Sequence, residues 1–382
     1  MAQRRRVDQR VGSRAVAPSK HHLAVIFGGR SSEHGISCVS AGNVLAAVDR
    51  ERWDVTPIGI TRDGAWTLAP DEPDRYAIRN GVVPEVPSGG ERVMFPPDPA
   101  IGGVVFADGR IAEIDVVFPV LHGYGGEDGA LQGVCELAGV PFVGSGVAAS
   151  AVCMDKIRTK EALRAAGIPI GPYVGITDHA WNTQRAAVLA QIATLGLPVF
   201  VKPARAGSSV GISRVTTAAE IEAAVTAARS HDRRVIVEAA VQQAREIECG
   251  VLATLAGPIV SECAEITVLG DHSFYDFTAK YLDGSAEITL PAALTINERA
   301  HIQALAVRAF TALGCEGMAR VDTFLTAEGE VLLNEPNTIP GFTATSMYPA
   351  VWQASGVSYP DLINALCEDA LRRGANPEVS GR

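Results

Sequence analysis

Apolar positions along the chain fall into two patterns, short continuous runs and runs with helical spacing. The continuous runs are bounded by turn residues and predict buried strands at residues 22–29, 53–61 and 114–123. Between and after them, apolar residues recur at helical intervals, which predicts helices at residues 39–49 and 131–140. Strands that alternate with helices are typical of an α/β fold, which we expect in this first part of the chain.

Residues 70–109 interrupt this order, because they are rich in Pro and Gly and have weak periodicity. They predict loops and a short hairpin that covers one edge of the first unit. From residue 154 onward the alternation returns. The predicted elements are helices at residues 154–167, 218–229, 299–314 and 360–374, and strands at residues 198–203, 211–215, 234–239, 319–325 and 330–335.

A chain of 382 residues is long enough for more than one domain. We predict three α/β units, followed and preceded by short tails. The units are residues 21–143, 144–237 and 238–374, and the tails are residues 1–20 and 375–382. The first tail carries six Lys or Arg against one acid, with no apolar core segment, and is predicted to be disordered.

The predicted hairpin brings acidic side chains to one face. If Leu325 pairs with Glu330 across the turn, even positions on the first strand share a face with odd positions on the second. A slip of one residue would send Asp322 to the opposite face. The residues expected on the shared face are Arg320, Asp322, Glu335 and, if the strand continues, Asn337.

Hard oxygen ligands gathered on one face suit Mg²⁺, which takes carboxylates together with phosphate oxygens. The sequence therefore favours a metal site on this hairpin. The alternative is a solvated hairpin face with an ordinary Arg–Asp pair, which does not explain why the flanking positions are so apolar.

Three glycine-rich loops are candidate phosphate sites, and none has the Walker A spacing. Residues 28–37 follow a strand and open a helix, but Glu33 would repel a pyrophosphate and suits an ammonium ligand. A capping acid at the helix start explains this stretch equally well. In residues 122–129, His122 stands where a strand ends, the edge at which open α/β sheets bind ligands, although a lone His is more often structural.

The third loop, residues 202–211, is the most informative. An apolar strand delivers Lys202 to the start of a Gly/Ser run, and Lys is a compact charge suited to phosphate. Lys156 begins a helix of the same unit, where the helix dipole also favours anions. Nucleotide binding explains this combination better than a flexible loop with one exposed Lys.

Composition and charge argue against several classes of protein. The net charge of −10 and the pI near 5.4 argue against a large basic face for nucleic acid. None of the seven cysteines forms a CxxC pair, so we expect reduced, buried thiols in a cytoplasmic protein. The N-terminal tail lacks the apolar segment of a signal peptide, and no later window is apolar enough for a membrane helix.

Taken together, the motifs resemble those of ATP-grasp enzymes, and within them the D-alanine–D-alanine ligase family. They occur in the family's order and extend from residue 23 to about residue 374. The motifs are GGRSSEHGIS, LHGYGGEDGALQG, PFVGSG followed by MDK, KPARAGSSVGIS, FYDFTAKY, RVD and NEPNTIPGFTATSMYP. The resemblance implies a three-domain ATP-grasp architecture with an N-terminal Rossmann-like domain and the metal and substrate site in the last unit.

The resemblance also implies the reaction. The carboxylate of one D-alanine would attack the γ-phosphate of ATP, and the amine of a second D-alanine would displace phosphate from the acyl phosphate. The dipeptide product serves peptidoglycan synthesis. The family uses two Mg²⁺ or Mn²⁺ ions, and a monovalent cation sometimes activates it. A cytoplasmic homodimer without nucleic-acid or membrane partners is implied.

Site roles carry over onto matching positions. The metal ligands would be Asp322, Glu335 and Asn337. The nucleotide contacts would be Lys156, Lys202, Glu238, Ala240, Val241, Glu246 and Lys280. Catalysis and substrate binding would fall to Glu33, His122, Ser208, Tyr281, Arg320, Gly341, Ser346 and Met347.

Within this set, Glu33 would anchor the first ammonium, with His122 near the first carboxylate. Arg320 and the Gly341 amide would stabilise the oxyanion. Ser346 and Met347 would bind the second substrate.

Ser208 and Tyr281 would link the lid loop to Glu33, and the Tyr form of FYDFTAKY favours a dipeptide over a D-lactate product. Three alternatives stay open: a ligase for another carboxylate such as D-lactate or D-serine, a non-catalytic nucleotide-binding relative, and an NAD-linked dehydrogenase. The missing GxGxxG weakens the dehydrogenase hypothesis.

Overall fold

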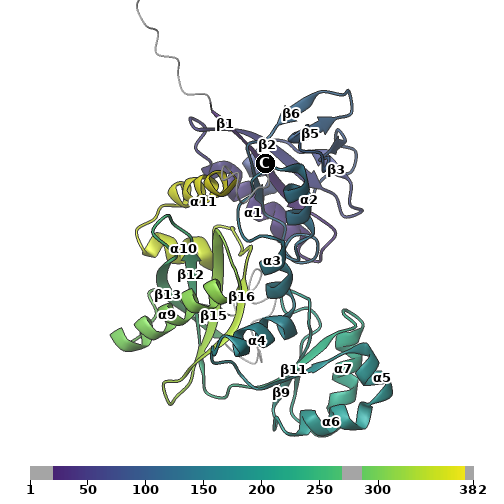
Figure 1. Ribbon diagram of the computed structural model, residues 1–382, viewed down its shortest axis with the longest axis vertical. Helices are drawn as coiled ribbons and strands as arrows, with labels where there is room; N and C mark the ends of the chain where they lie inside the picture. Colours follow the sequence, from purple (N-terminus) through teal and green to yellow (C-terminus); the bar gives the residue numbers. More distant parts are fainter. Residues whose placement is uncertain (1–19, 269–285, 375–382) are drawn as a thin grey trace, which may run out of the picture.

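The computed structural model describes residues 20–268 and 286–374 and arranges them in four sheets with surrounding helices (Figure 1). The first sheet has the order β3-β2-β1-β7, in which β1 pairs in parallel with β2 and β7. Its strands are β1 (His21–Gly28), β2 (Trp53–Ile60), β3 (Trp66–Leu68) and β7 (Val116–Pro119). The predicted α/β order of the first part of the chain is confirmed.

The residues of β1 alternate between two hydrophobic clusters on opposite faces of this sheet. Leu23, Val25 and Phe27 pack toward helices α1 (His34–Ala47) and α11 (Tyr359–Gly374). On the other side, Ala24 and Ile26 pack toward α2 (Ala130–Ala138) and a small three-stranded sheet. That sheet comprises β4 (Val93–Met94), β5 (Gly103–Phe106) and β6 (Ile111–Glu113), and η1 (Pro73–Tyr76) precedes it.

The middle of the chain builds an antiparallel sheet of order β10-β9-β11-β8. Helices α5, α6 and α7 pack on one face, with Trp181 as the largest buried side chain of that core. The strands are β8 (Tyr173–Ile176), β9 (Val199–Pro203), β10 (Ser213–Val215) and β11 (Val235–Ala239). The helices of this part are α3 (Val147–Met154), α4 (Lys156–Ala165), α5 (Asp178–Thr183), α6 (Arg185–Ala193), η2 (Ala218–Glu220) and α7 (Ile221–Arg229).

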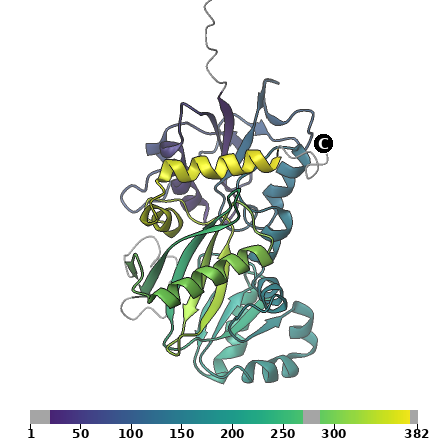
Figure 2. The same ribbon diagram turned by 60° about the vertical axis from the view of Figure 1, so that its left-hand side comes forward.

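The largest sheet has five antiparallel strands in the order β14-β13-β12-β15-β16. Helix α9 lies across one face of it, where Ile247, Cys249 and Val321 are buried (Figure 2). Helix α10 covers one end of the other face. The elements are β12 (Arg245–Leu252), β13 (Ile259–Val268), β14 (Ala286–Thr289), α9 (Ile296–Ala312), β15 (Met318–Leu325), β16 (Val331–Asn337) and α10 (Met347–Ala354).

The predicted hairpin forms, but its register near the turn is not the predicted one. Leu325 pairs with Val331 rather than with Glu330, so the loop is one residue longer than expected. A register shift between Asp322 and Thr323 then leaves Asn334 as an extra residue on β16, which is a β-bulge. Beyond the bulge Asp322 lies opposite Glu335. Asp322 and Glu335 therefore share a face because the longer loop and the bulge each shift the register by one residue, and the two shifts together restore the expected facing.

Two further expectations from the sequence concern the cysteines and membrane-spanning helices. All seven cysteines are free and buried, as predicted. Among the helices of the described ranges, 20–268 and 286–374, none is long and apolar enough to cross a membrane.

Candidate active site

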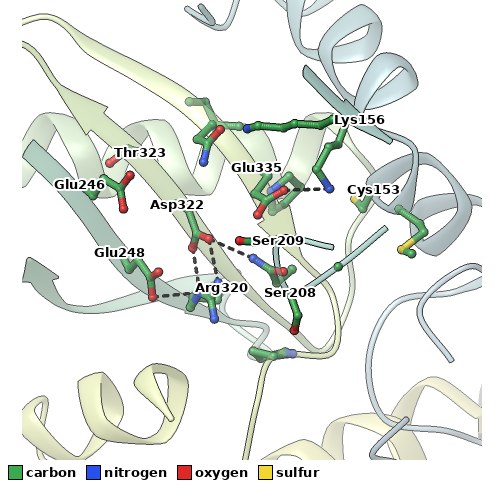
Figure 3. A pocket seen from close by; sticks show the side chains of 18 of the residues that line it. Cys153, Lys156, Ser208, Ser209, Glu246, Glu248, Arg320, Asp322, Thr323 and Glu335 are labelled. Atoms are coloured by element: carbon green, nitrogen blue, oxygen red, sulfur yellow. Dashed lines mark hydrogen bonds and ion pairs between the residues drawn. The ribbon is translucent and has the colours of Figure 1, made fainter. Parts of the chain in front are cut away.

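A cavity of about 360 Å³ opens between the sheet of β9 and β11 and the sheet of β12, β15 and β16 (Figure 3). Strand alternation makes its floor polar: while Cys249 and Val321 face α9, the alternate side chains of β12 and β15 face the cavity. The predicted site residues that line it are Glu33, His122, Lys156, Lys202, Ser208, Glu238, Val241, Glu246, Arg320, Asp322, Glu335, Asn337 and Gly341.

Asp322 is a carboxylate on the floor that is held by two side chains. The Arg320 guanidinium donates to both of its oxygens at 2.8 Å, and Asn337 Nδ2 donates to Oδ2 at 3.1 Å (Figure 3). Arg320 also lies 3.0 Å from Glu248 Oε2. The Arg–Asp pair of the simpler interpretation is thus present, and Asp322, Glu335 and Asn337 still share one face as the metal interpretation requires.

This donor set fits Mg²⁺. Two carboxylates and one amide oxygen fall short of an all-protein cage, and Mg²⁺ is typically held by one or two carboxylates together with substrate phosphates and water. A lysine side chain contacts one of these carboxylates. Lys156 Nζ lies 3.2 Å from Glu335 Oε2 and donates to the Ala206 carbonyl at 2.9 Å.

Glu33 lines the same cavity, in a space shaped by glycines. The Ser208 hydroxyl donates to Glu33 Oε1, so the predicted link between these residues is present. A Cβ atom on Gly207 would lie 2.6 Å from Glu33 Oε2, and one on Gly123 would lie 2.7 Å from it. Glu33 makes no side-chain capping bond at the start of α1, which argues against the helix-cap interpretation.

His122 and Glu127 lie beside Glu33. Ring atoms of His122 contact Ser40 Oγ at 3.0 Å and the Ile339 carbonyl at 3.2 Å, and burial lowers the pKa of the imidazole. Glu127 accepts a bond from the Gly123 amide at 2.6 Å. Burial and the neighbouring Glu33 raise the pKa of the Glu127 carboxyl to about 8, which keeps it mostly protonated at neutral pH.

Three predicted residues do not line the cavity. The Ala240 amide donates to the Pro198 carbonyl, and Met347 packs in the hydrophobic core with α11. Ser346 Oγ accepts a bond from the Thr343 amide at 2.9 Å and is 8% exposed. Lys280 and Tyr281 lie outside the described residues.

Sequence reasoning missed Lys160, Glu127 and Glu248, all of which line the cavity. Lys160 follows Lys156 by one helical turn, so i, i+4 spacing would have placed both on one face of α4. Glu248 follows Glu246 by two residues on β12, and side chains two residues apart on a strand lie on the same face. No comparable signal marks Glu127, whose burial depends on the packing of distant segments.

Comparison with known proteins agrees with this geometry. The family sequence model described as "D-ala D-ala ligase N-terminus" matches residues 22–145, and that described as "D-ala D-ala ligase C-terminus" matches residues 162–368. The D-alanine–D-alanine ligase of Streptomyces coelicolor is 52% identical over 364 residues, 92% of this chain and 93% of the relative. That of Mycobacterium tuberculosis is 51% identical over 363 residues, 92% of this chain and 96% of the relative.

Solved structures of ligases are also similar to this chain. The VanG D-Ala:D-Ser ligase of Enterococcus faecalis superposes with a TM-score of 0.80 at 38% identity, covering 91% of this chain and 98% of that one. The D-alanine–D-alanine ligase of Coxiella burnetii gives a TM-score of 0.76 at 35% identity, covering 93% and 96%.

Fold, cavity and comparisons define the chain as an ATP-dependent ligase of the ATP-grasp class. Within that class, the chain belongs to the D-alanine–D-alanine ligase family.

Proposed function

We propose that this protein joins two D-alanine molecules with consumption of ATP, and thereby supplies the dipeptide for peptidoglycan synthesis in the cytoplasm. The observation that carries the proposal is the composition of the cavity. Lysines and carboxylate oxygens suited to a metal ion gather near Lys202 and Glu335, and the same cavity holds an acid suited to an ammonium group, Glu33.

Asp322, Glu335 and Asn337 would hold the divalent ions, Mg²⁺ or Mn²⁺, which neutralise phosphate charge when bound. Lys156 and Lys202 would contact the nucleotide phosphates, and Lys280 would reach the γ-phosphate. Val241, Glu246 and the backbone near Ala240 would contact adenine and ribose. Phosphoryl transfer depends mainly on positioning and charge neutralisation, which this set provides.

On the substrate side, Glu33 would bind the ammonium of the first D-alanine, and Ser208 would hold the lid loop against Glu33. The first carboxylate would take the γ-phosphoryl group and release ADP. Attack by the second amine on the acyl carbon would then release phosphate. Arg320 and the Gly341 amide line the cavity where the tetrahedral oxyanion would form, and preorganised donors lower such barriers strongly.

Ser346 and Met347 would bind and shape the pocket of the second substrate. Because Ser346 Oγ is bonded within its own turn, this role requires that its contact with Thr343 be exchanged or shared. We also propose a homodimer, which light scattering of the purified protein tests directly.

Release of phosphate from ATP, measured with D-alanine alone and with mixtures, tests the activity. We expect ATP- and Mg²⁺-dependent phosphate release with D-alanine and a dipeptide identified by mass spectrometry. No release with D-alanine, but release with another acid, would contradict the proposal.

A D-alanine–D-serine ligase is the second candidate, since a D-Ala:D-Ser ligase is among the similar solved structures. Product analysis with equal D-alanine, D-serine and D-lactate separates these outcomes. We expect D-alanyl-D-alanine to predominate.

A further inference from the structure

Lys160 is a buried cation that the proposed chemistry does not use. It lies on α4 one turn after Lys156, and its side chain is 5% exposed. Its Nζ lies 2.8 Å from Glu238 Oε1 and 6.0 Å from the centre of the Tyr173 ring. The cost of burying an ammonium group is offset only when a partner of opposite charge is close, and Glu238 is that partner.

Glu238 bridges two lysines. Its other oxygen, Oε2, lies 2.7 Å from Lys202 Nζ. The strands explain the arrangement: Ile236 pairs with Lys202 and Glu238 with Phe200, so the Glu238 and Lys202 side chains lie on the same face of β9 and β11. Val199, Val201, Val235 and Val237 face the opposite core.

The two lysines differ in their access to the cavity. The Lys202 side chain is 16% exposed, compared with 5% for Lys160, so Lys202 is the more accessible of the two lysines that contact the shared carboxylate. Burial alone would raise the pKa of Glu238, but the two ammonium groups outweigh burial and hold its pKa well below the usual value. Glu238 is therefore ionised, and the three side chains together carry one net positive charge.

We propose that Lys160 is a positioning residue that neutralises Glu238, so that the charge of Lys202 remains available for the nucleotide phosphates. Without Lys160, Glu238 and Lys202 would form a closed pair with no net charge. A polyphosphate would then gain little from Lys202. The inference rests on the proposed ATP-dependent function, and it adds a residue that acts through Glu238 without touching the nucleotide.

The test compares the dissociation constants of ADP and adenosine at fixed Mg²⁺ by calorimetry. The ratio of the adenosine constant to the ADP constant isolates the phosphate contribution, because both ligands share the same base and sugar. We expect Lys160→Met to lower this ratio about tenfold, since the loss of one charge a few ångströms away changes binding by about 1.4 kcal/mol in a partly screened site. Lys160→Arg should retain the ratio.

A double variant separates charge from packing. Lys160→Met with Glu238→Gln removes one charge of each sign and leaves Lys202 with its positive charge. This double variant should restore the ratio toward that of the wild type, although its adenosine affinity differs. Arg158→Met on the same helix is the matched control, because Arg158 is exposed and pairs only locally with Glu161; it should leave both constants unchanged.

An unchanged ratio in folded Lys160→Met would overturn the inference, as would a lowered ratio that Glu238→Gln fails to restore. Circular dichroism checks the fold, and Lys160→Gln replaces Lys160→Met if that variant does not fold. Wild-type protein that binds ADP no more tightly than adenosine would contradict the proposed function itself, which distinguishes that failure from failure of the inference alone.

Discussion

Carboxylates in this cavity are held by specific neighbours, and these contacts make single substitutions informative. Asp322 is bonded by Arg320 and Asn337, whereas Glu335 contacts Lys156. Each carboxylate keeps a geometry fixed by a cation before any ligand binds. A metal ion that enters this site therefore meets ligands that need little reorganisation.

Asp322→Asn and Glu335→Gln should each raise the Mg²⁺ concentration needed for half-maximal phosphate release by about tenfold or more, since one charged contact contributes about 1.5–3 kcal/mol. Titration of Mg²⁺ at saturating ATP measures this. Glu330→Gln, at the exposed hairpin turn, is the matched control and should show the wild-type requirement. An unchanged Mg²⁺ requirement in both cavity variants would rule out the metal role.

The glycine beside Glu33 is a second sensitive position. In Gly207→Ala the new methyl group would meet Glu33 Oε2 at 2.6 Å, so the carboxylate must move away from the ammonium it is proposed to bind. We expect the KM for D-alanine to rise about tenfold with a smaller change in the KM for ATP. Steady-state kinetics measure both.

Gly133→Ala, in helix α2, provides the comparison, because the new methyl group would meet Val147 at an ordinary 3.9 Å. Equal KM values for Gly207→Ala and Gly133→Ala would show that the Glu33 carboxylate tolerates displacement, and would count against its role in binding the substrate.

At the scale of elements, the packing of α10 on the sheet requires a glycine in β12. Gly250 faces α10, and a Cβ there would lie 2.7 Å from Trp352 Nε1 and 3.0 Å from Tyr348. Gly250→Ala should lower the free energy of unfolding by about 1–3 kcal/mol, as overpacking of a filled core does. Urea denaturation measures the loss. Stability within about 0.5 kcal/mol of the wild type would mean that α10 shifts freely on the sheet.

The hairpin was predicted from the sequence only in part. Alternation and apolar flanks located both strands and placed Asp322 and Glu335 on one face. The loop length was wrong by one residue, and the bulge at Asn334 was not foreseen. A bulge depends on how a strand twists against its neighbours, and β16 pairs with β15, whose own register is set by β12. Local sequence does not contain that information.

The same limit applies to the site. Motif residues that lie on strands, such as Lys202 and Asp322, could be placed from their own segment. Glu127 could not, because its burial arises where residues 33, 123 and 320 meet. Helix α3 and strands β8 and β13 were also missed, since short or mixed runs carry weak periodicity.

At the scale of the whole molecule, the cavity joins segments that are far apart in the sequence. Glu33 comes from the first unit, Ser208 from the middle and Glu335 from the last, and contacts such as Ser208–Glu33 and Lys156–Glu335 connect them. Helix α11 returns to pack against α1 and β7. A perturbation in one unit is therefore expected to change the stability of the whole chain.

Buried His34 gives the stability of the chain a pH dependence. Nε2 accepts a bond from the Val86 amide at 3.1 Å, so Nδ1 carries the proton and donates to the Gly29 carbonyl at 2.7 Å. Burial lowers the pKa of the imidazole, which remains neutral in the folded protein. A second proton would fall on Nε2 and oppose the Val86 N–H.

The sign follows from proton linkage. Since the folded pKa lies below the unfolded value of about 6.5, the unfolded chain binds the proton first as pH falls, and His34 loses its stabilising contribution below about pH 6.5. His34→Gln can donate and accept but does not titrate. We therefore expect this substitution to cost more stability at pH 8 than at pH 5, with a difference of about 1 kcal/mol. Urea unfolding of both proteins at the two pH values measures it, and because other titrating groups are common to both proteins, their contributions cancel. An equal cost at both values would show that His34 titrates alike in the folded and unfolded chain.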